Sequence, residues 1–293
     1  MHLHTLITDG WDDYALLDSG AGRKLERMGG FTIDRPEPQA MWQPRHPHLW
    51  DKADAAFVTG SDEDDNAHGH WDNRRVPPNG WETSCDGIRF RGWLTNFRHV
   101  GYFPEQVAHW QWLQQRTKPG MKILNLFAYS GVHSLVAAKA GASVTHVDAS
   151  KKAIQWAKDN QALNNQEWPI RWIVDDALKF VQREARRGNL YDGILLDPPK
   201  FGRGPDNETW DLFTDLPQLL QACAAILNPD SNAFLLLTSY AIRASAVAFG
   251  QTVGAALPGA AVECGELFVR EQDNGRLLPT SMYARAVLTR AVK

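Results

Sequence analysis

From residue 120 onward, aliphatic runs alternate with helical patterns, and this alternation constrains the fold more than any other feature of the sequence. Strands are predicted at 121–127, 143–148, 169–175, 191–197 and 232–239. Helical patterns follow them at 131–141, 150–165, 177–188, 211–227 and 244–256, and two strand-like runs close the chain at 262–270 and 282–290. Short strand–helix connections demand right-handed crossovers and a parallel sheet covered on both faces. The sequence therefore predicts a doubly wound α/β fold.

The first part of the chain has a different composition. Tryptophans, prolines and short β-like stretches separated by turn residues predict a small β-rich domain at 1–95, with the α/β domain at 96–293. The tryptophans suit the core of such a domain, although aromatic platforms also stack on the bases of single-stranded RNA. The acidic run at 61–70 is expected to be an exposed loop, because so many carboxylates and amides cannot be buried together.

Charge and cysteine content exclude several classes of protein. Lys and Arg number 31 against 34 Asp and Glu, with a net charge of -3, which argues against binding to nucleic acid by overall charge alone but leaves a local basic patch open. Three widely spaced cysteines without a CxxC pair predict a reducing compartment and no thiolate zinc site. The histidine pairs lack flanking ligands, so no metal is predicted. With no leader-like start and no long apolar run, we expect a cytoplasmic protein without membrane contact; its oligomeric state is not indicated.

Chemistry is expected where the strands end, because ligands of doubly wound sheets bind outside the carboxyl ends of the strands. The first strand leads into a turn with a single glycine, Gly131, and no GxGxxG, which disfavours NAD and FAD. A ligand with an amino acid group and a nucleoside suits this looser turn. The second strand ends at Asp148, which is placed to accept hydrogen bonds from ribose hydroxyls or to cap the next helix. The third ends at Asp175 and Asp176, one a candidate helix cap and the other a candidate partner for an adenine amino group.

The fourth strand ends in Asp197, Pro198, Pro199 and Lys200. Two successive prolines prevent further sheet pairing and stiffen the turn, so that the carboxylate and the carbonyls after it are held in a fixed pose. Rigid acceptors suit the orientation of an N–H donor, which is catalysis by positioning. The alternative interpretations are a structural turn carboxylate and a solvated loop lysine.

Four segments, NLFAYSG, VDAS, DDAL and DPPKFGRG, make the chain resemble class I S-adenosylmethionine-dependent methyltransferases with a Rossmann-like sheet, and within them the Rlm-type ribosomal RNA methyltransferases. The resemblance covers residues 97–290 and includes GYFPEQ at 101–106. It implies S-adenosylmethionine as cofactor and RNA as partner. The cofactor contacts that it implies are Phe103, Gln106, Asn125, Phe127, Tyr129, Ser130, Gly131, Asp148, Ser150, Asp176 and Asp197.

The sequence departs from this branch at two places. Members that methylate carbon 5 of cytosine need a thiolate after the fifth strand, where this chain has Ser239, and Cys223 is better explained as a small buried hydrophobe. DPPK also resembles the Asp-Pro-Pro-aromatic turn of amino-methylating enzymes, but Lys200 replaces the aromatic residue and Phe201 follows it. We therefore predict methylation of a nitrogen in RNA, foremost ribosomal RNA. Alternatives are a protein or small-molecule methyltransferase, and a non-catalytic protein that binds the same cofactor.

Overall fold

The computed structural model describes residues 3–59, 69–240, 242, 244–273 and 275–289. The chain divides into two compact units. The first comprises Met1–Thr5, His109–Glu266 and Ser281–Lys293, and the second comprises Leu6–Ala108 and Leu267–Thr280. The second unit thus includes two segments that the predicted 1–95 domain left out, one before the α/β sequence and one near the end of the chain.

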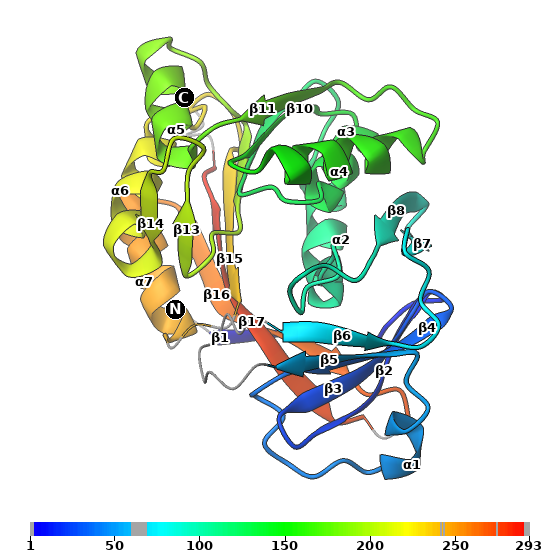
Figure 1. Ribbon diagram of the computed structural model, residues 1–293. Helices are drawn as coiled ribbons and strands as arrows, with labels where there is room; N and C mark the ends of the chain where they lie inside the picture. The colour runs from blue at the N-terminus through cyan, green and yellow to red at the C-terminus, as the bar shows by residue number, and fades with distance from the viewer. Residues whose placement is uncertain (1–2, 60–68, 241, 243, 274, 290–293) are drawn as a thin grey trace. The chain divides into compact units, whose positions relative to one another are not determined.

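An eight-stranded sheet forms the centre of the first unit (Figure 1). Its strands, in spatial order, are β1 (Leu3–Thr8), β16 (Ala261–Arg270), β17 (Leu277–Val287), β15 (Phe234–Tyr240), β12 (Gly193–Leu196), β9 (Lys122–Leu126), β10 (Ser143–Asp148) and β11 (Ile170–Val174). The run from β15 to β11 is parallel throughout, whereas β17 pairs antiparallel to β15. The predicted doubly wound sheet is confirmed. Its chain order reverses between β9 and β12, which is where such sheets bind ligands.

Helices cover both faces of this sheet (Figure 1). On one side lie α2 (Val107–Arg116), α3 (Val132–Lys139) and α4 (Lys151–Ala162), and on the other α5 (Ala177–Arg186), α6 (Leu212–Ala224) and α7 (Ala246–Ala256). Four of them begin at a residue whose side chain accepts hydrogen bonds from the first turn: Ser150 for α4, Asp176 for α5, Asp211 for α6 and Ser245 for α7. The predicted N-cap Ser150 is confirmed. Helix α2 and strand β1 had no counterpart among the predicted elements.

The apolar core lies between the sheet and helices α5 to α7. Alternate residues of β9 and β12 point into it, including Leu124, Leu126, Ile194 and Leu196, all at most 2% exposed. Because side chains of a strand alternate between faces, Asn125 turns to the opposite face, toward α3. The same strand therefore supplies hydrophobic burial on one side and a polar contact on the other.

The second unit is built from β-strands, as the sequence predicts. One sheet contains β2 (Tyr14–Gly20), β3 (Arg23–Met28), β4 (Phe31–Pro36), β5 (Ala55–Thr59) and β6 (Gly69–Asn73), in that order. A separate hairpin pairs β7 (Trp81–Cys85) with β8 (Ile88–Gly92), and the helical elements are α1 (Pro47–Trp50) and the 3-10 turn η1 (Pro104–Gln106). Trp81 is 5% exposed, which fits its predicted place in a core.

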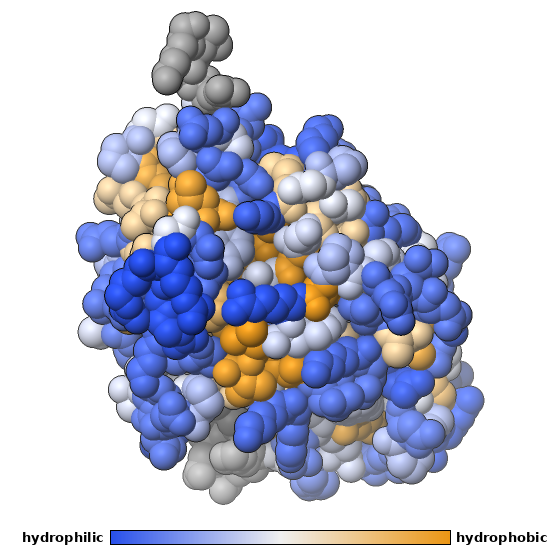
Figure 2. Space-filling model, turned by 90° about the horizontal axis from the view of Figure 1, so that it is seen from above, coloured by the Kyte–Doolittle hydropathy of each residue, from blue (hydrophilic) through white to orange (hydrophobic). Residues whose placement is uncertain are grey.

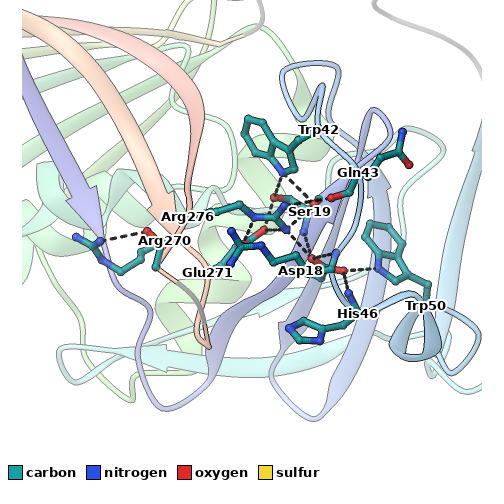
Figure 3. A network of polar contacts seen from close by, with 11 residues as sticks. Asp18, Ser19, Trp42, Gln43, His46, Trp50, Arg270, Glu271 and Arg276 are labelled. Atoms are coloured by element: carbon teal, nitrogen blue, oxygen red, sulfur yellow. Dashed lines mark hydrogen bonds and ion pairs between the residues drawn. The ribbon is translucent and has the colours of Figure 1, made fainter.

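A network of charged side chains explains why residues 267–280 belong to this unit (Figure 3). Arg276 donates to Asp18 at 2.8 Å and to Glu271 at 2.7 Å, and both carboxylates are fully buried. The Ser19 hydroxyl donates to Glu271 as well. Buried carboxylates must be paired and hydrogen-bonded, so this cluster holds the loop between β16 and β17 against β2.

Parts of two predicted features lie outside the described residues: positions 61–68 of the acidic run, which include His68, and His2 from the first histidine pair. Within the described ranges, no cluster of three or more His, Cys, Asp or Glu side chains is arranged to hold a metal ion. The helices described also include none with the length and apolar character needed to cross a membrane.

Gly193 in β12 provides a test of the packing at the sheet centre. A Cβ atom at this position would meet the ring of Phe234 at 2.3 to 2.8 Å, and that ring packs edge-on against Trp112 of α2. We expect Gly193→Ala to lower the free energy of unfolding by about 1–3 kcal/mol. Denaturant titration followed by circular dichroism measures this loss.

The matched control is Gly254→Ala in α7, where the nearest heavy atom lies 3.9 Å from the added Cβ. Alanine favours helix, so this variant should be as stable as the wild type or more stable by up to about 1 kcal/mol. Equal stability changes for the two substitutions would contradict the close approach of Phe234 to β12.

Candidate functional site

The loop after β9 has an unusual backbone. Phe127, Tyr129 and Gly131 all have positive φ, at 53°, 48° and 86°. Positive φ is uncommon for residues other than glycine and persists where surrounding contacts hold it. Such a loop, at the carboxyl end of the central strand, is a candidate for ligand binding.

Gly131 is required by the packing of this loop. A Cβ atom there would lie 2.7 Å from the Cβ of Ala157 on α4 and 3.3 Å from the His146 ring. Together with its left-handed φ, this contact excludes a side chain at position 131. The loop can therefore lie directly on α4 with its backbone amides at the start of α3, which is where ligand groups approach a helix N-terminus.

Asp148 connects the loop to the next strand. One carboxylate oxygen accepts a hydrogen bond from the backbone N–H of Tyr129 at 2.8 Å, and the other accepts one from Ser150 at 2.8 Å. Burial raises the pKa of Asp148 above its ordinary value, and the two backbone N–H groups counteract that rise. Each oxygen keeps a further lone pair, so the carboxylate that orders the loop can also accept hydrogen bonds from ligand hydroxyls.

Beneath the loop lies a buried chain of polar side chains. The amide of Asn125 donates to the Ser134 hydroxyl at 2.9 Å, and that hydroxyl lies 3.0 Å from Nδ1 of His146. All three residues are at most 3% exposed, and Trp172 packs on the imidazole. Burial lowers the pKa of His146 from 6.5 to about 3, so the ring is neutral near pH 7. Asn125, predicted as a cofactor contact, thus has a demonstrated role in joining β9 to α3, and its contact with the cofactor stays a prediction.

The remaining loop residues are held from α4. The Ser130 carbonyl accepts a hydrogen bond from Asn160 at 2.9 Å, and the Tyr129 ring packs edge-on against Trp156 with centroids 5.4 Å apart. Phe127 leans the other way, onto Trp210, at 4.9 Å. The predicted loop residues therefore do come together, each fixed by a different neighbour.

The two carboxylates after β11, Asp175 and Asp176, make different contacts. Asp176 caps α5 by accepting from the Lys179 backbone N–H at 2.9 Å. Asp175 accepts from the Asp176 N–H and forms an ion pair with Arg183, while its own N–H donates to the Asp148 carbonyl at 3.1 Å. The helix cap is thus identified as Asp176, and contact of either carboxylate with adenine stays a prediction.

The Asp-Pro-Pro-Lys turn lies beside the loop. Leu196 of β12 pairs with Leu126 of β9, so Asp197 and Phe127 follow adjacent strand ends. Asp197 and Lys200 are partly buried, Pro198 is buried and Pro199 is exposed. The Pro199 carbonyl accepts a hydrogen bond from the Trp210 indole at 2.7 Å. The predicted catalytic residues thus stand next to the predicted cofactor loop.

Phe103 and Gln106 belong to the second compact unit. Phe103 precedes η1, and Gln106 ends it with 3% of its surface exposed. Their predicted contact with the cofactor stays a prediction.

Sequence patterns did not identify several residues that shape this region. Trp210, His146 and Trp156 each touch the loop or the polar chain beneath it. The signal for His146 was available, since it interrupts an apolar strand next to Asp148. Trp210 lies in the pair of short strands β13 (Phe201–Arg203) and β14 (Thr209–Asp211), whose lengths give no periodic pattern.

These residues fit S-adenosylmethionine. The carboxylate of Asp148 is an acceptor suited to ribose hydroxyls, and the backbone amides after Gly131 stand at the start of α3, where ligand groups approach a helix N-terminus. The loop lacks the second glycine that a pyrophosphate requires.

Comparison with known proteins agrees with this assignment. A family model described as S-adenosylmethionine-dependent methyltransferase matches residues 63–254, more than half of the chain. The structure of an S-adenosylmethionine-dependent methyltransferase from Agrobacterium tumefaciens superposes with a TM-score of 0.92 at 47% identity, covering 98% of this chain and 94% of that one. A putative methyltransferase crystallised with S-adenosylhomocysteine, SMU.776, shares the fold at 18% identity, with a TM-score of 0.72 over 93% of this chain and 75% of that one.

Among curated sequences, the chain is similar to proteins named ribosomal RNA large subunit methyltransferase K/L. Identity is 38% over 146 residues for that of Pseudoalteromonas atlantica and 34% over 145 residues for that of Hahella chejuensis. Each match covers 49% of this chain but 20% of the relative. The aligned region is thus about a fifth of the length of these relatives.

Replacing Asp148 tests the cofactor assignment. Asp148→Asn keeps the size of the side chain but replaces one of the two charged oxygens by an NH2 group. The variant therefore cannot accept hydrogen bonds from both backbone N–H groups and from a ribose hydroxyl. We expect the affinity for S-adenosylhomocysteine to fall by roughly 10- to 100-fold, the loss of one or two charge-assisted hydrogen bonds. Isothermal titration calorimetry measures it. The control Asp159→Asn, on the exposed side of α4, should bind as the wild type does; equal affinity of the Asp148 variant would show the assignment to be wrong.

His146 makes the fold sensitive to acid. The unfolded chain takes up a proton at this imidazole below about pH 6.5, whereas the folded protein resists protonation until about pH 3. Stability is therefore present above pH 6.5 and is lost as the pH falls through this window. Relative to His146→Gln, the wild type should lose about 2 kcal/mol of unfolding free energy between pH 7.5 and 5. Urea titrations at both pH values test this, with His48→Gln, an exposed residue, as the control that follows the wild type.

Proposed function

Because the chain belongs to the family of S-adenosylmethionine-dependent methyltransferases, we propose that it transfers a methyl group to a nitrogen of an RNA base, with ribosomal RNA as the leading substrate class. One observation carries the choice of acceptor: a rigid group of hydrogen-bond acceptors, Asp197 and Pro198, stands at the strand end next to the cofactor loop. An amine or ring N–H is the donor that such a group can orient.

The two prolines of the turn offer carbonyl acceptors but no backbone donor. Pro198 and Pro199 have no N–H, and the Pro199 carbonyl is already engaged by Trp210. Within the part of the chain that the structure describes, the Pro198 carbonyl accepts no hydrogen bond. The carboxylate of Asp197 and the carbonyl of Pro198 are therefore the groups that would hold an acceptor N–H and aim its nitrogen lone pair. When bound, S-adenosylmethionine supplies an electrophilic methyl group, so alignment is the main task left to the protein.

The cysteines do not support methylation of a pyrimidine carbon, which needs an activated thiolate. Cys85 lies in β7 of the other unit, Cys223 within α6 and Cys264 in β16, and all three are buried. Burial raises the pKa of the Cys85 thiol to about 12 and that of Cys223 still further. Neutral, buried thiols are inert, which leaves nitrogen as the favoured acceptor.

The surface beside the turn is suited to a nucleobase. Phe201 is 52% exposed, and the ammonium of Lys200 lies 5.1 Å from its ring centroid. Figure 2 shows a face of the molecule that is mostly hydrophilic, with groups of hydrophobic residues exposed between hydrophilic ones. We infer that the half-exposed Phe201 ring, next to the proposed reactive turn, contacts the substrate. Unstacked RNA bases stack on exposed aromatic rings, and a lysine beside the ring favours a phosphate-bearing substrate.

Two further arguments concern the substrate. The relatives named ribosomal RNA large subunit methyltransferase K/L support RNA, and a base within a helix would have to be flipped out to be methylated. The N-terminal unit, predicted as 1–95, is proposed to contribute to substrate choice, since the methyltransferase sheet is otherwise generic. Methylation of a protein or small molecule, or cofactor binding without catalysis, are outcomes that the experiment below distinguishes.

Replacing Asp197 tests the proposed role of the turn. The protein is incubated with methyl-labelled S-adenosylmethionine and total RNA from cells that lack its gene. We expect Asp197→Ala to reduce methyl transfer at least about 100-fold, because the acceptor nitrogen loses its orientation. Binding of S-adenosylhomocysteine should stay within a few-fold of the wild type.

The matched control is Asp230→Ala, an exposed carboxylate in the loop before β15, which should transfer at the wild-type rate. Label that appears only in protein would sink the RNA proposal. Undiminished transfer by Asp197→Ala would remove the turn from the mechanism.

A further inference from the structure

Trp210 connects the two parts of the site. It lies in β14, opposite Gly202 of β13, and only 7% of it is exposed. Its indole N–H donates to the Pro199 carbonyl at 2.7 Å, and its ring lies 4.9 Å from the ring of Phe127, tilted by 54°. One side chain therefore touches both the catalytic turn after β12 and the cofactor loop after β9.

Both contacts of Trp210 are with backbone segments that no β-ladder stabilises. Phe127 has a positive φ of 53°, a conformation that costs about 1–3 kcal/mol and must be held by its surroundings. The Asp-Pro-Pro turn lies outside any ladder of β12, because prolines cannot donate to one. Packing on Phe127 and the hydrogen bond to Pro199 supply that support from one rigid residue.

The hairpin that carries Trp210 is itself fastened to the turn. The Lys200 carbonyl accepts a hydrogen bond from the Leu212 backbone N–H at 2.9 Å, next to the start of α6. A Cβ atom on Gly202 would lie 3.3 Å from the Pro199 ring and 3.7 Å from the Trp210 Cβ, so hairpin and turn are in close contact. Both carbonyls that follow Pro198 are thus engaged by this segment.

We propose that Trp210 is a positioning residue for methyl transfer, which acts through the Pro199 carbonyl and through Phe127. By holding the Pro199 carbonyl, the indole N–H sets the rotation of the turn that carries the Asp197 carboxylate and the Pro198 carbonyl. By packing on Phe127, the ring keeps the cofactor loop in register with that turn. The inference rests on the proposed function, because it concerns how the same site orients its substrate.

The two contacts can be separated by substitution. Trp210→Phe keeps a ring against Phe127 but removes the N–H, whereas Trp210→Leu removes both. For Trp210→Phe we expect kcat for RNA methylation to fall roughly 10- to 100-fold, as small misplacements of reacting groups do, with KM for RNA little changed. Its affinity for S-adenosylhomocysteine should stay within about threefold, a shift that such a retained packing contact allows. Trp210→Leu should lose affinity for S-adenosylhomocysteine as well as kcat.

Trp112→Phe is the matched control. Trp112 is also a tryptophan packed on a phenylalanine, but its partner Phe234 is the first residue of β15 and pairs with Gly193, the first residue of β12, so it lies at the amino ends of the parallel strands. A merely structural role of Trp210 predicts that both Trp→Phe variants lose activity in proportion to their loss of melting temperature. A fall in kcat specific to Trp210→Phe supports positioning, and equal effects of the two variants would overturn it.

Amide hydrogen exchange gives a readout that does not depend on activity. Peptides spanning residues 200–213 should exchange faster in Trp210→Phe than in the wild type, and this change should be absent in Trp112→Phe. If the wild type methylates no RNA, the proposed function fails while the exchange comparison still decides the inference about Trp210. Unchanged exchange in Trp210→Phe, or wild-type kcat in that variant, would refute it.

Discussion

The site depends on the parallel pairing of β9 with β12. This ladder places the carboxyl end of β9 next to the carboxyl end of β12, with Leu126 opposite Leu196. The chain leaves both strands at that edge in conformations that no sheet can continue, one with positive φ and one through two prolines. The candidate cofactor loop and the proposed acceptor turn are thereby neighbours, although neither segment contributes to the ladder itself.

Contacts with neighbouring residues hold these two segments in fixed conformations. Asp148 ties the loop to β10, the chain from Asn125 to His146 supports it from below, and Trp210 joins it to the turn. Each of these contacts uses a buried or partly buried polar group that is hydrogen-bonded, so its stability depends on correct geometry. The arrangement favours alignment of reacting groups over acid–base chemistry, as expected where the leaving group is a sulfonium.

The sequence predicted the elements whose signal is periodic or local. The aliphatic runs identified the parallel strands and their order along the chain, and Ser150 was correctly assigned as a helix cap. The strand ends also indicated where Asp148 and Asp197 would lie, because the edge of a parallel sheet follows from its topology. Long-range contacts escaped prediction. The sequence around Trp210 does not indicate that its side chain faces Pro199 and Phe127. Helix α2 also escaped prediction, because it lacks a clear apolar stripe: Trp110 and Leu113 lie among polar residues that are themselves buried, such as His109.

Strand β1 has a consequence for how this protein is assembled. It lies at residues Leu3–Thr8 and pairs with β16, which begins only at Ala261, so the outer part of the large sheet joins the earliest and latest segments of the described chain. The β-rich unit therefore consists of two segments, Leu6–Ala108 and Leu267–Thr280, that interrupt the sequence of the first unit. During synthesis on the ribosome, the small unit can complete its own five-stranded sheet early, whereas β1 cannot pair until β16, at Ala261–Arg270, has been made. Dividing the gene at residue 95 would separate β1 from its partner, and because the β-rich unit also includes Leu267–Thr280, a swap of that unit between relatives would need four junctions instead of one.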